Sequence, residues 1–459
     1  MKKHTIFDDT TQYYHKNPVE NYTGICNMRP KKQSREKQAN FLYPELMDQL
    51  NPKDPLLELG KKIPWEKIET AFTKFYSNKG RRAKPVRLMT GLLILKQMND
   101  LSDEEVVQTW VQNPYYQAFC GYRRFHWQVP CDPSELTYFR KRIGDEGAEL
   151  IFKVSTEIHG ETALAKEIVV DTTVQEKNIT FPTDSKLMRK VIEKCRDIAK
   201  NTGIKLRRSF KRELPKLLCR RNKTKKVNNR IKTIAGILIR EIKRKLPKEY
   251  RDIYAQTLEL FTRVHNQKKN DKNKLYSLHE LEVSCICKGK AHKKYEFGSK
   301  VSFAITKETN IIVGVKNFND NPYDGHTLPA VLEQVEQTIG MRPETVFCDR
   351  GYRGKKNIDG TRIYIPGRPK KKATASEKEK MRHNFRRRAA IEPIIGHVKH
   401  DCRMARNYLK GVAGDVFNAL MAGAAFNFRK WARNLKQFVF CLYFFLFKVH
   451  FTKQFAMVL

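Results

Sequence analysis

The stretch KEIVVDTTV, residues 166–174, decides the fold, because β-branched residues lie on both sides of the acid in its middle, Asp171. Isoleucine, valine and threonine favour extended backbone, so the run predicts a strand. Its apolar character predicts that this strand is buried. A carboxylate inside a buried strand is costly unless a partner or a metal ion neutralises it. Asp171 is therefore the first candidate for a functional acid.

The segments that follow predict an α/β fold around this strand. Apolar alternation predicts further strands, which we expect at 281–287, 300–306, 311–315, 344–348 and 361–365. Apolar residues at helical spacing predict helices, which we expect at 327–339, 382–409 and 416–435. An α/β core is thus expected from about 160 to 430, interrupted by a long basic segment.

The region 84–144 predicts three short helices in front of this core. Ser102 is an N-cap with Glu105 three residues later, a capping box that begins the second helix. Asp132–Pro133 begins the third helix, which we expect to end near Gly144. Three capped helices with a basic last helix are compatible with a helix-turn-helix module, and a plain helical bundle is an equal alternative. The cations of the last helix expected to contact DNA are Arg140 and Lys141.

The charge of the chain predicts a polyanionic partner. The formal net charge is +41, from 90 Lys and Arg against 49 Asp and Glu. Such self-repulsion does not help folding, so nucleic acid is the expected partner. An anionic membrane is the rival, but the first ten residues carry no apolar export segment. The apolar run FVFCLYFFLF at 438–447 is shorter than the about 20 residues that a spanning helix needs.

These features indicate a cytoplasmic protein with no membrane partner. The ten cysteines show no spacing typical of a zinc site or a disulfide framework, which agrees with reduced thiols.

The segment 185–275 is helical in pattern and densely cationic, as in KLRRSFKREL at 205–214. Its apolar stripes are sparse. The pattern indicates an inserted helical domain that lies on phosphate, and a solvated charged hairpin is the alternative. The cations expected to contact DNA here are Arg207, Arg208, Lys211 and Arg212.

Two further acids extend the candidate site. Asp349 directly follows an expected strand, and Glu392 lies on an expected helix, four residues after Arg388 and seven before Lys399. That spacing places the side chains of Arg388, Glu392 and Lys399 on one helical face. Mg²⁺ prefers oxygen ligands, and two ions about 3.5–4 Å apart can hold the attacking and leaving oxygens of phosphoryl transfer. We therefore expect Asp171, Asp349 and Glu392 to bind metal, and the two cations to meet DNA phosphates.

Several segments together carry a resemblance to a known family. DTTVQEKNITFPTDSKL (171–187), CDRGYRG (348–354) and the pattern Phe385-x2-Arg388-x3-Glu392-x6-Lys399 resemble ordered motifs of the DDE transposases of the insertion-sequence-five family. Three more segments are similar to family segments: RLMTGLLILKQMNDLSDEEV (87–106), YEFGSKVSFA (295–304) and NPYDGHTL (321–328). The resemblance covers most of residues 40–435. It departs at Phe385, where the family has Tyr, so a role for that hydroxyl is lost.

The resemblance implies a ribonuclease H-like mixed-sheet catalytic core, with an N-terminal helical DNA-binding domain and a basic helical insertion. It implies two Mg²⁺ or Mn²⁺ ions on the acids Asp171, Asp349 and Glu392, with Arg388 and Lys399 at the basic positions. The implied substrates are double-stranded terminal inverted repeats and target DNA, joined by cut-and-paste in a homo-oligomer on paired ends. The expected domains are 1–150 (N-terminal helical), 160–184 with 276–435 (catalytic, split), 185–275 (insertion) and 436–459 (apolar tail).

Two alternatives stay open. A ribonuclease H-like DNA nuclease would cut without strand transfer, and an inactive DNA-binding derivative would bind without cutting.

Overall fold

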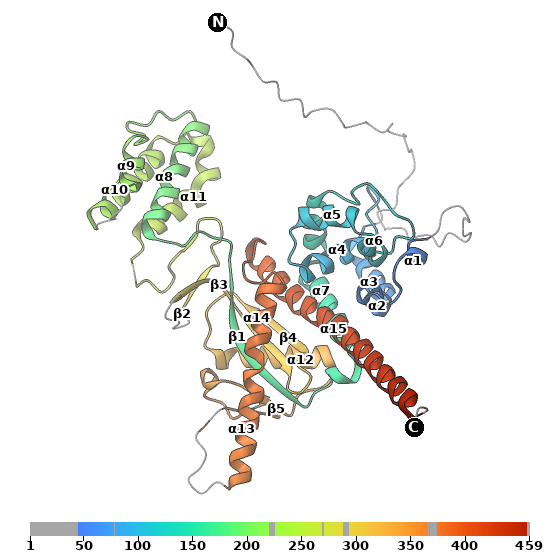
Figure 1. Cartoon of the computed structure of the whole chain (residues 1–459). Helices are drawn as coiled ribbons and strands as arrows, with labels where there is room; N and C mark the ends of the chain where they lie inside the picture. The colour runs from blue at the N-terminus through green and yellow to red at the C-terminus, as the bar shows by residue number, and fades with distance from the viewer. Residues whose placement is uncertain are drawn as a thin grey trace.

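A mixed β-sheet lies at the centre of the chain, with helices on both of its faces (Figure 1). The strands are paired in the order β2-β3-β1-β5-β7-β6, with β4 also pairing β3. Within the described residues they are β1 Glu167–Glu176, β2 Ser284–Cys287, β3 Tyr295–Thr306, β4 Ile312–Phe318, β5 Thr345–Phe347, β6 Asn357–Ile358 and β7 Thr361–Tyr364. β1 runs antiparallel to β3 and parallel to β5. The chain is therefore an α/β protein with a mixed sheet, as the sequence predicts.

The computed structural model describes most of the chain, in the segments 45–77, 79–219, 225–268, 270–287, 293–365, 367 and 374–456. Residues 1–44 of the expected N-terminal domain lie outside these segments. Side chains of the last helix are described as far as Leu435, so those of the expected apolar tail at 436–459 lie outside as well. Within the part described, no helix combines the length and apolarity that crossing a membrane requires.

The C-terminal helices differ in their limits from those expected. They are α12 Asp324–Ile339, α13 Ala375–Ala389, α14 Ile391–Asp401 and α15 Gly411–Ala456. The helix expected at 382–409 begins earlier, because the Thr374 hydroxyl accepts a hydrogen bond from the backbone of Glu377 at 3.2 Å and caps α13. It is also divided at Ala390 and ends at Asp401.

Different helices cover the two faces of β1. Val169 packs in the apolar cluster that includes α14 and α15, whereas Ile168 and Val170 pack with α12. Side chains alternate along a strand, so Asp171 shares the face of Val169, and Thr172 shares that of Val170. The acid of β1 therefore projects from the face that α14 covers.

The N-terminal helices confirm the two expected caps. These helices are α1 Leu46–Gln49, α2 Pro55–Lys62, α3 Trp65–Phe72, α4 Val86–Met98, α5 Asp103–Gln112, α6 Pro114–Phe119 and α7 Pro133–Glu157. The Ser102 hydroxyl accepts from the backbone of Glu105 at 3.1 Å, and the Asp132 carboxylate accepts from that of Ser134 at 2.8 Å. Gly144 breaks the helical backbone where an end is expected (φ 56°, ψ −157°), but the helix then resumes to Glu157.

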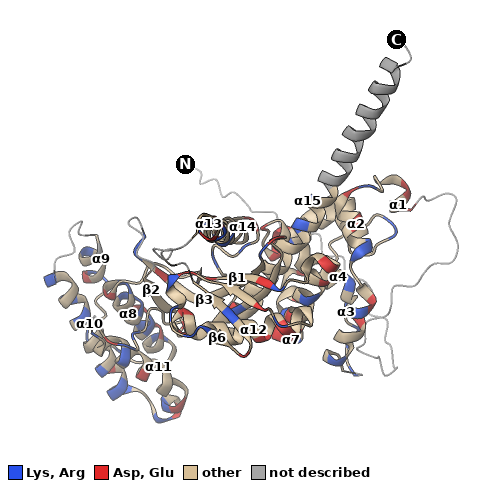
Figure 2. Cartoon of the chain, turned by 90° about the horizontal axis from the view of Figure 1, so that it is seen from below, with Lys and Arg blue, Asp and Glu red and all other residues tan. Residues whose placement is uncertain are grey.

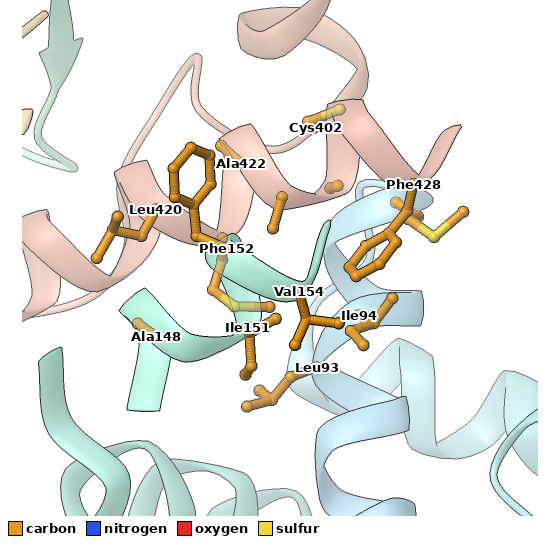
Figure 3. Close-up of a cluster of buried hydrophobic side chains, with 14 of the residues drawn as sticks. Leu93, Ile94, Ala148, Ile151, Phe152, Val154, Cys402, Leu420, Ala422 and Phe428 are labelled. Carbon is orange, nitrogen blue, oxygen red and sulfur yellow. The ribbon is translucent and has the colours of Figure 1, made fainter. Parts of the chain in front are cut away.

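Apolar side chains join these N-terminal helices to the rest of the protein. Leu93 and Ile94 of α4, Ile151 and Val154 of α7, and Phe428 of α15 converge in one buried cluster (Figure 3). The same cluster continues to strands of the sheet. α7 and α15 thus connect the N-terminal helices to the sheet through a continuous core.

The inserted segment forms a helical bundle that stands apart from the sheet (Figure 1). Its described helices are α8 Asp184–Asn201, α9 Glu213–Leu218, α10 Lys225–Lys245 and α11 Lys248–Asn266. They share an apolar cluster of their own, including Val191, Ile234 and Phe261. Lys and Arg are spread over these helices (Figure 2). The described residues of this segment thus fold mainly into helices.

A buried ion-pair cluster anchors the two ends of the insertion to the sheet. Lys177, directly after β1, lies 2.6 Å from a carboxylate oxygen of Asp415 on α15 and 3.2 Å from one of Glu280. All three side chains are at most 7% exposed. Glu280 lies where the chain returns from the insertion, and it also accepts a hydrogen bond from the Gly411 backbone at 3.0 Å. The insertion thus leaves and re-enters the core at one buried point.

His159 is expected to make the stability of this core depend on pH. Burial lowers its pKa from 6.5 to about 4, although a hydrogen bond to the Asn427 carbonyl raises it. The unfolded chain therefore binds a proton that the folded chain does not, between pH about 6.5 and about 4. The contribution of neutral His159 to the free energy of unfolding is complete above pH 6.5. It decreases as the pH falls towards 4, by at most about 1.4 kcal/mol per pH unit.

The measurement is the free energy of unfolding by urea at several pH values. His159→Gln should show a smaller loss than the wild type between pH 6.5 and 4. His383→Gln, at an exposed position on α13, is the matched control and should behave as the wild type. Parallel curves for wild type and His159→Gln would contradict the assignment.

Candidate active site

Strand register brings Asp171 and Asp349 to one edge of the sheet. In the parallel pair of β1 and β5, Val169 lies opposite Phe347. Asp171 and Asp349 each follow two residues later, so both leave the same edge on the same face. Asp349 lies just beyond β5, where its carboxylate accepts from the Gly351 backbone at 2.8 Å and caps a short 3₁₀ turn.

Carboxylates of the site contribute to the raised pKa values of two buried side chains beside them. The pKa of the Cys348 thiol lies well above its usual value, first because of burial and then because of the carboxylates of Asp349 and Asp171. The pKa of Tyr352 is raised well above 10.0, again by burial first and then by Cys348 and Asp171. Arg388 opposes the shift at Cys348. The two acids therefore create a local negative potential that suits a cation.

Helix α14 covers this face but leaves Glu392 exposed. Ile391, Ile394 and Val398 of α14 pack in the same cluster as Val169 and Phe347. Glu392 is 63% exposed, and its carboxylate lies 3.4 Å from the Arg388 guanidinium, which is a weak ion pair.

The structure thus brings two of the three expected metal-binding acids together. In the part of the chain that is described, no three His, Cys, Asp or Glu side chains are grouped closely enough to hold a metal ion. Two carboxylates at a strand edge still provide the hard oxygen ligands that Mg²⁺ takes, since this ion usually keeps several waters. Asp171 and Asp349 fit that donor set, and Glu392 does not join it in this arrangement.

A third carboxylate, Asp324 at the start of α12, approaches the site from the other face. Its Oδ1 accepts a hydrogen bond from the Thr172 hydroxyl at 3.0 Å and from Lys300 Nζ at 2.8 Å. A Cβ added to Gly351 would lie 2.9 Å from a carboxylate oxygen of both Asp324 and Asp349. A side chain at this position would therefore require at least one of the two carboxylates to move.

The sequence pattern does not mark Asp324 or Lys300 as site residues. Both lie in segments that resemble the family, but neither stood out by spacing. Lys300 is only 8% exposed and also donates to the Pro322 carbonyl at 2.6 Å. The one signal in the sequence is a lysine at the start of the expected strand 300–306, where Val301, Phe303 and Ile305 alternate.

Phe385, which begins the sequence pattern that contains Arg388 and Glu392, lies against the sheet. Phe385 on α13 stacks at 6.1 Å on Tyr364 of β7, which lies 5.1 Å from Phe347. Nearby, Asn384 accepts a hydrogen bond from Lys307 Nζ at 2.9 Å. These contacts hold α13 on the sheet, and with it Arg388, which is 21% exposed.

Among the other expected DNA contacts, Lys399 lies on α14 with Glu392, and the rest lie away from the acids. Arg140 is 8% exposed, and its guanidinium makes two hydrogen bonds to the Asp103 carboxylate, at 2.8 and 2.6 Å. Its neighbour Lys141 is exposed. Lys399 lies partly buried on α14. The insertion cations are also exposed, on the bundle and away from the acids: Arg207, Arg208, Lys211 and Arg212.

Comparison with known proteins adds independent findings. A family model described as a transposase domain (DUF772) matches residues 44–142, and one described as a transposase DDE domain matches residues 261–428. The second range contains Asp349 and Glu392, whereas Asp171 precedes it, on the other side of the insertion.

One relative is an uncharacterised protein, ORF8 in the nfe locus of Rhizobium meliloti. It is 44% identical over 191 residues, which is 40% of this chain and 91% of that protein. No solved structure matches the chain.

Lys300 is expected to hold Asp324 in the folded protein. Lys300→Met removes the cation from a partly buried carboxylate, so the free energy of unfolding should fall by about 1–3 kcal/mol. Asp324→Asn in the same chain should restore part of that loss. Chemical denaturation of the two single variants and the double variant measures the coupling between the pair. Lys355→Met, at an exposed position, is the control. If the effects of Lys300→Met and Asp324→Asn simply add, the two side chains do not stabilise each other.

Proposed function

Because the chain belongs to the DDE transposases, which are enzymes that act on DNA, we propose that it is a transposase of the insertion-sequence-five family that moves a bacterial insertion sequence by cut-and-paste. The observation that carries the proposal is the pairing of Asp171 with Asp349 at one edge of the sheet, beneath the helix of Glu392. A pair of carboxylates at that position suits metal-dependent phosphoryl transfer on a +41 chain.

In this proposal the three acids hold two divalent ions, Mg²⁺ or Mn²⁺. The ions would supply Lewis acidity and a reactive water. Asp171 and Asp349 bind from the sheet. Glu392 is exposed and only weakly paired with Arg388, and in this proposal its side chain turns towards the two acids when DNA occupies the site. Lys300 neutralises Asp324, which limits the repulsion among the acids before the ions bind.

The reaction would begin with cleavage at the ends of the element, and the freed 3′-hydroxyl would then attack target DNA. Arg388 and Lys399 would meet phosphates beside the acids. Lys141 offers an exposed contact on the N-terminal helices. Arg140 is instead engaged with Asp103, so we assign it to the stability of that region.

The domain assignment belongs to the same proposal. Residues 1–150 and the insertion at 185–275 would bind the terminal inverted repeats, and 160–184 with 276–435 would form the ribonuclease H-like catalytic domain. Two ends must be joined in one event, so we propose a homo-oligomer on paired ends.

The decisive experiment is a cleavage and strand-transfer assay with Mg²⁺ on labelled DNA that carries the ends of the element. The wild type should give joined products. Asp171→Ala and Glu392→Gln should each lower the rate by at least about a hundredfold, because losing a metal ligand removes several kcal/mol of stabilisation from the transition state. Glu379→Gln, an exposed acid on α13, is the matched control and should keep full activity.

Different outcomes distinguish the alternatives. Cutting without joining would indicate a nuclease. Binding of the ends without any cutting would indicate an inactive DNA-binding derivative. Full activity of Asp171→Ala would exclude this site.

A further inference from the structure

A cationic pocket lies in the inserted bundle, away from the acids. It has a volume of about 510 Å³ and opens between α10 and the loop that follows α8. Five arginines and one acid give the pocket its charge: Arg207, Arg208, Arg230, Arg240, Arg244 and Glu241.

The pocket exists because α10 has two unlike faces. Ile231, Ile234 and Leu238 are fully buried in the core of the bundle. Arg240 and Arg244 are four residues apart and exposed, so they follow each other along the other face. The packed helix therefore presents two guanidinium groups from a rigid backbone.

Carboxylates of the bundle neutralise only part of this charge. Glu213 pairs with Arg230 at 2.7 Å and with Arg208 at 3.5 Å. The side chains of the other three pocket arginines make no ion pair with any described residue; they are Arg207, Arg240 and Arg244. The pocket therefore has more guanidinium groups than nearby carboxylates to pair with them.

Phe210 lines the pocket beneath two of its arginines. It is 7% exposed, with a φ of 51°, and the guanidinium carbons of Arg208 and Arg230 lie 4.8 and 6.0 Å from its ring centre. Since arginines occupy the ring, it offers no free surface on which a base could stack. It orients their planar guanidinium groups, which match the geometry of phosphate oxygens.

We infer that this arginine pocket binds consecutive backbone phosphates of DNA, without reading base sequence. The inference rests on the proposed function and deepens it by locating the DNA contact of the insertion. It differs from attraction by a diffuse cationic surface, because Lys211 and Arg212 belong to the same basic run but do not line the pocket. Contacts to phosphates position a protein on DNA, whereas base contacts give specificity.

The test compares two full-length variants that lose equal charge. Arg240→Gln with Arg244→Gln removes two pocket cations. Lys243→Gln with Lys248→Gln removes two exposed cations of the same bundle that do not line the pocket. Binding to a labelled duplex is measured by fluorescence anisotropy at several salt concentrations.

The affinity for DNA falls as salt rises, and the loss of two phosphate contacts should make the slope of log affinity against log salt less negative by about 1.8. The pocket variant should therefore bind at least about tenfold more weakly at low salt, on DNA with or without the element ends. The control should bind within about twofold of the wild type. Equal losses in both variants, or none in the pocket variant, would overturn the inference.

A competitor distinguishes a site for the DNA backbone from a site for a small anion. Inorganic pyrophosphate should displace DNA only weakly. If the wild type binds pyrophosphate tightly and the pocket variant binds DNA as well as the wild type, the pocket is a site for a small anion and the inference is overturned. Because binding is measured without cleavage, the result stands even if the wild type does not cut DNA. Failure of the proposed function and failure of the pocket are thus distinguishable.

Discussion

The parallel pairing of β1 with β5 is the interaction on which the candidate active site depends. Its register places Val169 opposite Phe347, and so brings Asp171 and Asp349 to the same edge and face. A slip of one residue would turn Asp171 towards α12, because the side chains of a strand alternate. The antiparallel pairing of β1 with β3, which spans nine residue pairs, makes such a slip costly.

The insertion extends from this sheet without disturbing it. The buried cluster of Lys177, Asp415 and Glu280 joins its two ends to α15. One lysine between two buried carboxylates is stable only while all three remain in place, since an unpaired buried charge costs about 3–5 kcal/mol. The bundle also has its own apolar core. It can therefore carry the proposed DNA contact while the strands keep their register.

Local patterns were predicted well where local chemistry decides them. The strand at 166–174 and the caps at Ser102 and Asp132 are present as expected, because β-branched residues and capping side chains act on their own backbone. The end at Gly144 was only partly right, since the helix resumes on an apolar face that packs against α15. Arg140 was expected to be a surface cation, but its carboxylate partner, Asp103, lies on another helix.

The sequence by itself determined the α/β class, the charge and the candidate acids, because residue type and short-range spacing carry that information. Only the tertiary structure decided which groups meet. The register of β1 and β5 brings Asp171 to the same sheet edge as Asp349, 178 residues later in the chain. Packing of α12 on the sheet pairs Asp324 with Lys300 of β3. The arginine pocket likewise needs α10 and a distant loop to pack together. Such contacts follow from the burial of many apolar side chains at once, which no local pattern encodes.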